Sequence, residues 1–476
     1  MGWFGGTGFC AKWRNWSAKW RMGMVERCGF RAKWRNRSAK WRNRSARWRM
    51  GMVEGCGFRA KWRNWSAKWR NRSAKWRILL GPPVSVGFVL RQVAQLVETA
   101  ERSCTAQYSP RRDRRRVAGV HANFVNSAHG GRPDCDAVAM PSTNYDGPIR
   151  WGIVATGGIA AQAVADLALL RDAQTVAVAS RTHARAAAFA AEHDIPRAYG
   201  SYEEIVHDPE VDAIYVATPH AQHYTISRQA IEAGKPLLIE KAFTCTHAAA
   251  ADLVGRARKN NVFVMEAMWM RFQPGIHQMR TMIEQGVIGE VRWIQGDLGF
   301  VNDIDLPRLV DPAAGGGILL DCGVYLVQLS QWLLGRPSTV TATGRLGETG
   351  VDVEAGVLLG YAEGAHAALS CSFTSDCPGA VTIVGTEGHI TIEPRFHHTS
   401  AIRIARRGTA VQVLANPLIG TGLAHEFDHV GQCLRAGLAE SPIMPLDDTL
   451  DVMAILDVAV DMVGAPHVDE GFTPAR

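Results

Sequence analysis

Short apolar runs alternate with helical segments between residues 148 and 266. The runs read PIRWGIV (148–154), TVAVAS (175–180), AIYVATP (213–219), PLLIE (236–240) and VFVME (262–266). The segments between them carry apolar residues at helical spacing, as in ATGGIAAQAVADLALL after the first run. Strands that alternate with helices indicate a parallel sheet with helices on both faces. We therefore predict an α/β domain over residues 146–267.

The pattern becomes strand-rich after residue 290. VEAGVLLGY (353–361), HAALSCSF (366–373) and VTIVG (381–385) are short stretches with apolar and polar residues in alternation. Such alternation is typical of strands in a sheet with one buried face. We predict a second, α+β domain over residues 268–468, whose last helices cover this sheet or return to the first domain.

Charge divides the chain near residue 140. The protein has 476 residues and a formal net charge of +8. Residues 1–140 hold 30 Lys and Arg against 7 Asp and Glu, whereas the rest of the chain holds 23 against 38. A change of composition this sharp marks a boundary, and an acidic body does not favour a nucleic-acid-binding core.

The basic segment repeats a seven-residue unit, as in AKWRNRSAKWRNRSARWR (32–49). Its Ala and Trp lie two and then five residues apart, so they form no coiled-coil seam, and an odd period sends successive Trp to opposite faces of a strand. We expect residues 1–140 to be disordered. Two interpretations stay open: a Trp/Arg arm that binds nucleic acid or an anionic membrane surface, or a translated DNA repeat upstream of a true start at Met140.

The acidic body has five scattered cysteines and no C-x-x-C pair. This spacing favours reduced thiols over a disulfide framework. No apolar run reaches the roughly 18 residues of a membrane span. We expect a cytoplasmic protein that does not enter the membrane.

The loop after the first strand, ATGGIA (155–160), is an A-x-G-x-x-A variant of the dinucleotide-binding fingerprint. Gly157 would let the backbone approach a pyrophosphate, and the small Ala160 would let the helix pack on the strand. The helix N-terminus would face the phosphates. The predicted cofactor contacts in this loop are Ala155, Thr156, Gly157, Gly158 and Ile159.

The second strand ends at Ser180-Arg181-Thr182, where NAD-specific proteins carry an acid. A hydroxyl and a guanidinium suit the 2′-phosphate of NADP, so we predict NADP in preference to NAD. Residues at the carboxyl ends of the other strands should line the same crevice. The predicted set is Thr218, Pro219, His220, His223, Glu240 and Lys241, in which the two histidines would shape the cofactor loop rather than perform chemistry.

Several separated motifs resemble the Gfo/Idh/MocA family of glucose–fructose oxidoreductases and inositol dehydrogenases. They are GIVATGGIA (152–160), TPHAQHYTISRQAIEAGKPLLIEKAF (218–243) and GGGILLDCGVY (315–325). MEAMWMRFQP (265–274), GTEGHITI (385–392) and HEFDHVGQCLRAG (425–437) are most similar to its dimeric dihydrodiol dehydrogenase branch, which includes NADP-dependent D-xylose dehydrogenases. The likeness runs from about Ile149 to about Val463.

The resemblance implies a fold and an activity. The fold is a Rossmann dinucleotide-binding domain followed by a domain with an open, mostly antiparallel sheet that forms a homodimer face. The activity is transfer of a hydride between NADP and a carbinol of a small polyol, aldose or trans-dihydrodiol. The family's catalytic motifs map to Glu240-Lys241 and to Asp321-x-Gly323-x-Tyr325. Ala242 stands where the family has Pro, which leaves the geometry of this turn in question because X–Pro is the only cheap site for a cis peptide.

Oxidation of a carbinol releases a proton that the protein must accept. Tyr is a poor base near neutral pH, and a nearby ammonium would lower the pKa of Tyr325. Lys241 would supply that ammonium, and Asp321, one helical turn before Tyr325, would orient Lys241 or a second substrate hydroxyl. The sequence does not decide which of Lys241 and Tyr325 transfers the proton. Trp269 and Arg271 would either border the substrate or pack in the core.

Two alternatives compete with this dehydrogenase. His425-Glu-Phe-Asp-His429 matches the zinc motif H-E-x-x-H, with Glu426 as its base, but Gln432 and Arg435 stand where a metzincin needs Gly and His. The other alternative is an inactive oxidoreductase-fold protein whose basic arm does the binding, which the loss of Pro after Lys241 favours. We predict the dehydrogenase, with no metal.

Overall fold

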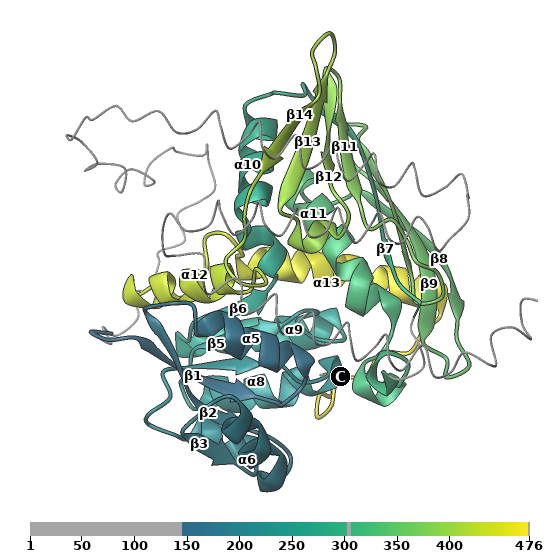
Figure 1. Ribbon diagram of the computed structural model, residues 1–476. Coiled ribbons are helices and arrows are strands. Elements are labelled where there is room, and N and C mark those ends of the chain that lie inside the picture. Colours follow the sequence, from purple (N-terminus) through teal and green to yellow (C-terminus); the bar gives the residue numbers. More distant parts are fainter. Residues whose placement is uncertain (1–144, 302–305, 475–476) are drawn as a thin grey trace, which may run out of the picture. The chain divides into compact units, whose positions relative to one another are not determined.

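The computed structural model describes residues 145–301 and 306–474. The predicted basic extension of residues 1–140, with its interpretations as an arm or as a translated repeat, lies outside the described residues. The described residues form a parallel sheet and a mixed sheet, each with its own helices (Figure 1). This is the fold class that the sequence predicts.

The parallel sheet has the strand order β3-β2-β1-β4-β5-β6. Its strands are β1 (Ile149–Val154), β2 (Ala173–Ala179), β3 (Arg197–Tyr199), β4 (Ala213–Val216), β5 (Leu237–Glu240) and β6 (Val264–Ala267). The helices that connect them are α5 (Gly158–Leu167), α6 (His183–Glu192), α7 (Tyr202–Val206), η1 (His220–Gln222), α8 (His223–Glu232) and α9 (His247–Asn260). β4 and β5 are buried along their whole length, as expected for strands covered on both faces.

The order of this sheet reverses at β1, which pairs with β2 on one side and with β4 on the other. Val154 at the end of β1 lies opposite both Ala179 and Val216. The loops that follow these three strands therefore start at the same level and open a crevice at the reversal point, where doubly wound folds bind ligands.

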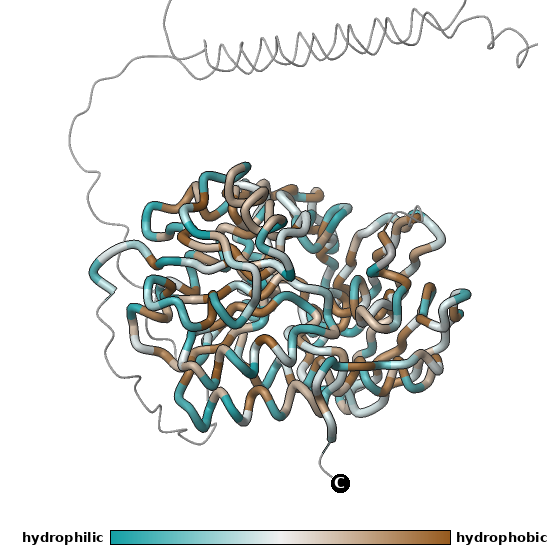
Figure 2. The backbone as a smooth tube through the Cα atoms, turned by 90° about the horizontal axis from the view of Figure 1, so that it is seen from below, coloured by the Kyte–Doolittle hydropathy of each residue, from teal (hydrophilic) through white to brown (hydrophobic). Residues whose placement is uncertain are grey.

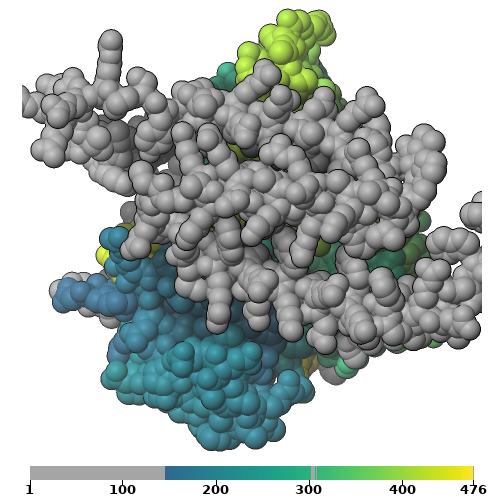
Figure 3. Space-filling view, viewed as in Figure 1, coloured from purple at the N-terminus to yellow at the C-terminus, as the bar shows by residue number. Residues whose placement is uncertain are grey.

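The second sheet has the order β14-β13-β12-β11-β7-β10-β9-β8. Its strands are β7 (Val291–Gly299), β8 (Thr339–Leu346), β9 (Asp352–Gly360), β10 (His366–Ser372), β11 (Val381–Gly385), β12 (Gly388–Ile392), β13 (Ala401–Arg406) and β14 (Gln412–Ala415). Every pair is antiparallel except β7 with β10, a parallel pairing that the sequence pattern did not predict. β13 and β14 form a tip of this sheet, which is visible in the space-filling view (Figure 3).

Helices and short turns join the two sheets. They are η2 (Trp269–Phe272), α10 (Pro274–Glu284), η3 (Pro307–Leu309), η4 (Pro312–Ala314), the π-helical turn η5 (Leu319–Gly323), α11 (Val324–Leu334), η6 (Phe396–His398), α12 (Ala424–Arg435) and α13 (Leu446–Val463). α11 packs on β7 and β10, and α12 packs on α5 and η2. α13 contacts β6 and α9 beside the parallel sheet as well as β8 and α11, so it binds the two sheets together.

The segment Pro312–Leu334 is long and apolar enough to cross a membrane by length and composition. Of its most apolar window, 83% is buried inside the protein, which is how the core helix of a globular fold behaves. In Figure 2, apolar residues, drawn brown, are interspersed with polar ones along the backbone of the described body.

Candidate active site

A cavity of about 1190 Å³ lies between the carboxyl ends of the parallel strands and the helices that carry the mixed sheet. One wall is the loop of residues 155–159 together with Ser180, Arg181, Thr218 and Pro219. The opposite wall includes Asp321, Tyr325 and His397, and Lys241 lies between the two. The predicted cofactor and catalytic residues thus meet in one space.

The loop before α5 leaves the helix N-terminus open. Gly157 is the N-cap in an extended conformation, no side chain caps the helix, and its first turn carries no acid. A Cβ built at Gly157 or at Gly158 would meet nothing within 4 Å. Ala155 has a positive φ of 104°, a conformation that favours glycine, which the fingerprint has at this position. Unpaired amides that face open space fit the pyrophosphate of a dinucleotide.

The end of β2 carries two arginines. Arg181 and Arg185 are both exposed and line the cavity, and Ser180 is buried beside them. Residues 180–185 contain no acid. Arg185, in the first turn of α6, was not predicted, although its spacing of four from Arg181 was a readable signal. Thr182 is the N-cap of α6 and does not line the cavity.

Lys241, Asp321 and Tyr325 form a compact group. Lys241 Nζ donates to the backbone oxygen of Asp321 at 2.6 Å and lies 3.3 Å from Asp321 Oδ1. The same nitrogen is 4.8 Å from the centroid of the Tyr325 ring. Trp269 Nε1 donates to Tyr325 Oη at 2.7 Å. Asp321 lies in the π-helical turn that leads into α11, so the main chain and the side chain of one residue both reach the ammonium.

Burial and charge compete in this group. Burial would lower the pKa of Lys241, but Asp321 and then Tyr325 outweigh it, and the net shift is upward. Burial would raise the pKa of Asp321, but Lys241 and Arg308 lower it to about 2. Burial raises the pKa of Tyr325 above its ordinary value, and Lys241 only partly opposes this. Lys241 thus lowers the pKa of Tyr325 as expected, but burial is the larger effect and the net shift is upward.

Hydrogen bonds to the Glu240 carboxylate support the turn that carries Lys241. Lys241 N donates to Glu240 Oε2 at 3.2 Å, and Tyr215 Oη donates to the other oxygen of the same carboxylate. The Lys241–Ala242 peptide bond is cis, although residue 242 is not proline.

Two buried histidines contact carbonyl oxygens of this turn. His220 Nε2 lies 3.2 Å from the oxygen of Lys241, and His223 Nδ1 lies 3.0 Å from that of Ala242. Their other ring nitrogens face Gly315 O and Thr218 O. His223 does not line the cavity, so its place fits the predicted role in shaping the loop.

The sequence did not single out three further residues at the site. The His397 ring lies 4.9 Å from the Tyr325 ring, and the His398 ring stacks on Trp269 at 5.6 Å. Arg308 Nη1 lies 3.6 Å from Asp321 Oδ1. They come from η6 and η3, short turns without periodicity, and the adjacent histidines in a loop were the only available signal.

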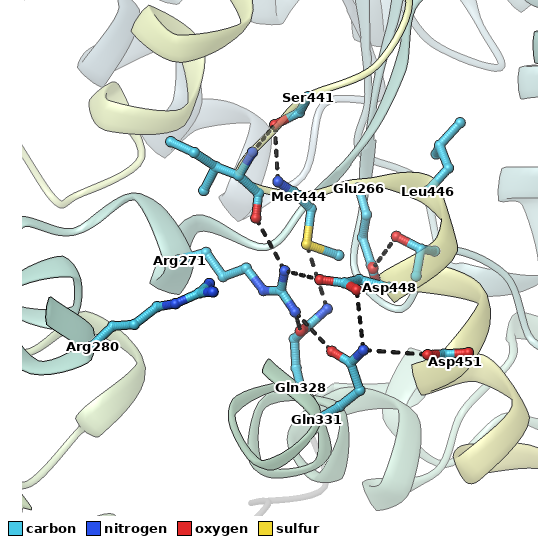
Figure 4. Close-up of polar contacts among 12 residues, drawn as sticks. Glu266, Arg271, Arg280, Gln328, Gln331, Ser441, Met444, Leu446, Asp448 and Asp451 are labelled. Atoms are coloured by element: carbon cyan, nitrogen blue, oxygen red, sulfur yellow. Dashed lines mark hydrogen bonds and ion pairs between the residues drawn. The ribbon is translucent and has the colours of Figure 1, made fainter. Parts of the chain in front are cut away.

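Arg271 packs in the core, the second of the two interpretations of this residue. It is fully buried, it does not line the cavity, and so it does not border a substrate there. Its guanidinium donates to Asp448, to Gln331, to Gln328 and to the oxygen of Ile443 (Figure 4). Trp269, the other predicted substrate neighbour, does line the cavity.

The H-E-x-x-H match lies in α12 with its side chains engaged in packing contacts. His425 Nε2 accepts from Ile419 N at 3.1 Å, and His429 Nε2 lies 2.8 Å from Ser441 Oγ. Glu426 is fully buried, and neither of its carboxyl oxygens has a hydrogen-bond partner. Within the described residues no three His, Cys, Asp or Glu side chains gather as metal ligands would.

Comparison with known proteins finds matches over the regions of both sheets. Residues 149–268 match the oxidoreductase family model described as an NAD-binding Rossmann fold, and residues 276–391 match the GFO/IDH/MocA C-terminal domain. The trans-1,2-dihydrobenzene-1,2-diol dehydrogenase of Xenopus laevis is 39% identical over 327 residues, which cover 67% of this chain and 99% of that protein. The human protein of the same name is 37% identical over 328 residues, covering 66% and 97%.

Solved structures give the same picture. A 3-ketoreductase from Actinomadura kijaniata, in complex with NADP and TDP-benzene, is 25% identical and covers 67% of this chain and 99% of its own, with a TM-score of 0.61. A levoglucosan dehydrogenase in complex with NADH and levoglucosan is 21% identical, covers 66% of this chain and 97% of its own, and has a TM-score of 0.60. At that identity the second likeness concerns the fold alone.

Proposed function

The chain belongs to the Gfo/Idh/MocA family of NAD(P)-dependent oxidoreductases, and from that premise we propose that it is an NADP-dependent dehydrogenase acting on a carbinol of a trans-dihydrodiol, aldose or small polyol. The observation that carries the proposal is the Lys241–Asp321 pair over the ring of Tyr325, in a cavity that also contains the open N-terminus of α5. A hydride acceptor on one side of a substrate and a proton-handling pair on the other is what carbinol oxidation needs.

The choice of NADP rests on the end of β2. Two guanidinium groups, Arg181 and Arg185, face the cavity there without a neighbouring carboxylate in residues 180–185. A 2′-phosphate carries charge that these groups can pair with, whereas a 2′-hydroxyl gains little from them.

The cofactor supplies the site that accepts or returns the hydride. Lys241 Nζ has three donor hydrogens, and the two contacts with Asp321 leave one for a substrate oxygen. The proton of Tyr325 is also free for that oxygen, because Tyr325 Oη accepts its own bond from Trp269. Trp269 and His397 both contact Tyr325, Trp269 at the phenol oxygen and His397 at the ring.

The direction of the pKa shifts bears on the direction of the reaction. Lys241 and Tyr325 already hold their protons near neutral pH at their ordinary pKa values, and both values are raised further in this site. A site in this state is ready to give a proton to a carbonyl oxygen during reduction. Oxidation first requires loss of one of these protons, so its rate should rise toward alkaline pH while the rate of reduction falls.

The test is a substrate screen with the full-length protein. NADP and NAD are each tested with trans-1,2-dihydrobenzene-1,2-diol, D-xylose and D-glucose, and the absorbance of the reduced nicotinamide reports turnover. Lys241→Met is the inactive control. We expect turnover with at least one of these substrates and a kcat/KM for NADP about tenfold or more above that for NAD. Absence of both turnover and NADPH binding would overturn the proposal and favour an inactive oxidoreductase-fold protein.

Two further sequence predictions belong to the same proposal. A homodimer would use the mixed sheet, on which Leu358 of β9 is 49% exposed beside a shallow groove. Sedimentation of the full-length chain would show twice the chain mass. A cytoplasmic location agrees with the free cysteines of the described residues, and fractionation of cells that make the protein would test it.

A further inference from the structure

Glu266, near the end of β6, is a fully buried carboxyl group that the proposed chemistry does not use. Its Oε1 accepts from the backbone N–H of Phe243 at 3.2 Å. Its Oε2 accepts from the hydroxyl of Thr449 in α13 at 3.0 Å. One carboxyl thus joins two segments that are about two hundred residues apart in the sequence.

The first segment is the turn of Lys241. Phe243 is two residues after the lysine, and its side chain is fully buried. His220 and His223 already contact the carbonyl oxygens of residues 241 and 242, and Glu266 accepts the next amide. Side chains from three different elements therefore fix the backbone on which Lys241 stands.

The second segment leads to the helix of Tyr325. Asp448, the neighbour of Thr449, accepts from Arg271 Nη1 at 2.6 Å and from Gln331 Nε2 at 3.1 Å. Gln331 lies in α11, the helix that contains Tyr325. Figure 4 shows Glu266 and the Arg271 group together beside the first part of α13.

We propose that Glu266 is a positioning residue: by anchoring the Lys241 turn to α13, it sets the place of Lys241 relative to Asp321 and Tyr325. The inference rests on the proposed function. A carboxyl group in a fully buried place is costly to the fold, and an apolar side chain would fill the same volume at lower cost. The carboxyl contributes two directed hydrogen bonds, one to the backbone of Phe243 and one to the side chain of Thr449. Together they fix these two segments relative to each other.

Charged side chains from three elements lie around Glu266. Arg271 of η2 favours its anion, Glu240 of β5 disfavours it, and Asp448 of α13 is engaged by Arg271. Burial is the largest effect and raises the pKa of Glu266 to about 7, against the opposing effects of Thr449 and Arg271. A neutral carboxyl still accepts the Phe243 amide on its carbonyl oxygen, so the anchor is present in both protonation states.

The test uses three variants and one matched control in the full-length protein. Glu266→Leu removes both bonds, Thr449→Val removes one without changing the volume, and Glu266→Gln keeps an acceptor for Phe243 and a partner for Thr449. The control is Asp208→Ala, which removes a buried carboxyl with three partners (Tyr199, Glu210 and Arg197) at a place that does not line the cavity. Any of the four can lower thermal stability, so the readout must be local to Lys241.

The local readout is the ¹³Cε chemical shift of Lys241 near neutral pH, measured by NMR of ¹³Cε-lysine-labelled protein and assigned with Lys241→Met. We expect it to move in Glu266→Leu and to move less in Thr449→Val, because a displaced lysine leaves Asp321 and the face of the Tyr325 ring. The value in Glu266→Gln and in Asp208→Ala should equal that of the wild type. If Glu266→Leu does not fold, the comparison of Thr449→Val with the wild type decides whether the inference holds.

Kinetics give the second readout. We expect kcat to fall about 10- to 100-fold in Glu266→Leu, with a smaller fall in Thr449→Val, because a displacement near 1 Å has effects of this size. The KM for NADP should change less than kcat, since the loop of residues 155–159 is untouched. An unchanged ¹³Cε chemical shift of Lys241 in both variants, with a loss of stability like that of Asp208→Ala, would overturn the inference. An inactive wild type would instead contradict the proposed function, and the NMR result would still decide the role of Glu266.

Discussion

The ammonium of Lys241 lies over the face of the Tyr325 ring, while the hydroxyl of that ring accepts from Trp269. Lys241 and Tyr325 therefore interact through the face of the aromatic ring. Lys241 Nζ and Tyr325 Oη can each donate to a substrate from a separate direction. A cation over an aromatic face is stabilised by roughly 0.5 to 2 kcal/mol, which helps to keep the ammonium in place.

Tyr325→Phe should separate the role of the phenol proton from that of the aromatic ring. The ring and its contact with Lys241 remain, and only the phenol proton is lost. We expect kcat to fall about 100-fold or more, because a positioned acid or base contributes at least that much. Trp269→Phe, which removes the donor to Tyr325 and keeps an aromatic side chain, is the control and should cost much less. A Tyr325→Phe enzyme within threefold of the wild type would assign the proton transfer to Lys241 alone.

Asp321→Asn should move the pH profile of oxidation. Asp321 raises the pKa of Lys241 against burial, so without this carboxylate burial prevails and the pKa of Lys241 falls. The deprotonated lysine then forms at lower pH, and the rising limb of kcat/KM for oxidation shifts toward neutral pH. Asp376→Asn changes another carboxylate that lines the same cavity and should leave the limb in place. If the rising limb of kcat/KM stays in place in Asp321→Asn, that limb does not report the titration of Lys241.

Arg181→Ala and Arg185→Ala should act on NADP alone. Loss of a charge-assisted hydrogen bond to a phosphate costs about 1.5 to 3 kcal/mol, which is roughly a 10- to 100-fold rise in the KM for NADP. The KM for NAD should change little, and so should that for the substrate. Arg256→Ala in α9, an arginine that does not line the cavity, controls for the loss of a positive charge. Equal effects on both cofactors would show that the arginines bind a group that NAD and NADP share.

Glu426→Met should make the protein more stable at neutral pH. Burial raises the pKa of Glu426 well above its ordinary value of 4.5, and Glu240 and Asp166 add to this. The folded state then keeps a proton that the unfolded chain releases above about pH 4.5. Stability therefore falls as pH rises from 4.5 toward the folded pKa, by about 1.4 kcal/mol for each pH unit.

The measurement is denaturant unfolding of the wild type and Glu426→Met at pH 4.5 and at pH 8. The wild type should lose more stability between the two than the variant does, because the variant has no carboxyl group to titrate. Parallel pH dependence in the two proteins would show that Glu426 finds a partner in solution.

Arg271→Met should lower stability with little direct effect on binding. The guanidinium is fully buried and pairs with Asp448, so its removal leaves a carboxylate and two glutamines without their donor. Loss of one partner of such a pair costs about 3 to 5 kcal/mol. Chemical unfolding should show this loss, and the KM for substrate should remain near the wild-type value. A large rise in that KM with unchanged stability would restore Arg271 as a substrate contact.

The sequence predicted the features of the site that follow from strand order. Val154, Ala179 and Val216 end three strands at one level, so the loops that follow them had to meet. The strand pattern also placed Lys241 in the crevice, whereas its catalytic role and the choice of Tyr325 came from the resemblance.

Other features depend on packing that no local pattern records. Arg271 and Trp269 are two residues apart, yet one turns to Asp448 and the other to Tyr325. His397 reaches Tyr325 from a turn that the antiparallel strands β11 and β12 precede. The pKa of Tyr325 depends on how completely the site is buried, which the residue types alone do not give.

Helix α13 has a consequence for the synthesis of the protein. Residues 448 and 449 connect the turn of Lys241 with the helix of Tyr325, but they are translated more than a hundred residues after both. A nascent chain that has left the ribosome only as far as residue 440 contains the whole cofactor loop and both catalytic candidates, without the helix that holds them at working distance. In such a chain the turn of Lys241 and the helix of Tyr325 are complete, but the residues that connect them have not yet been made.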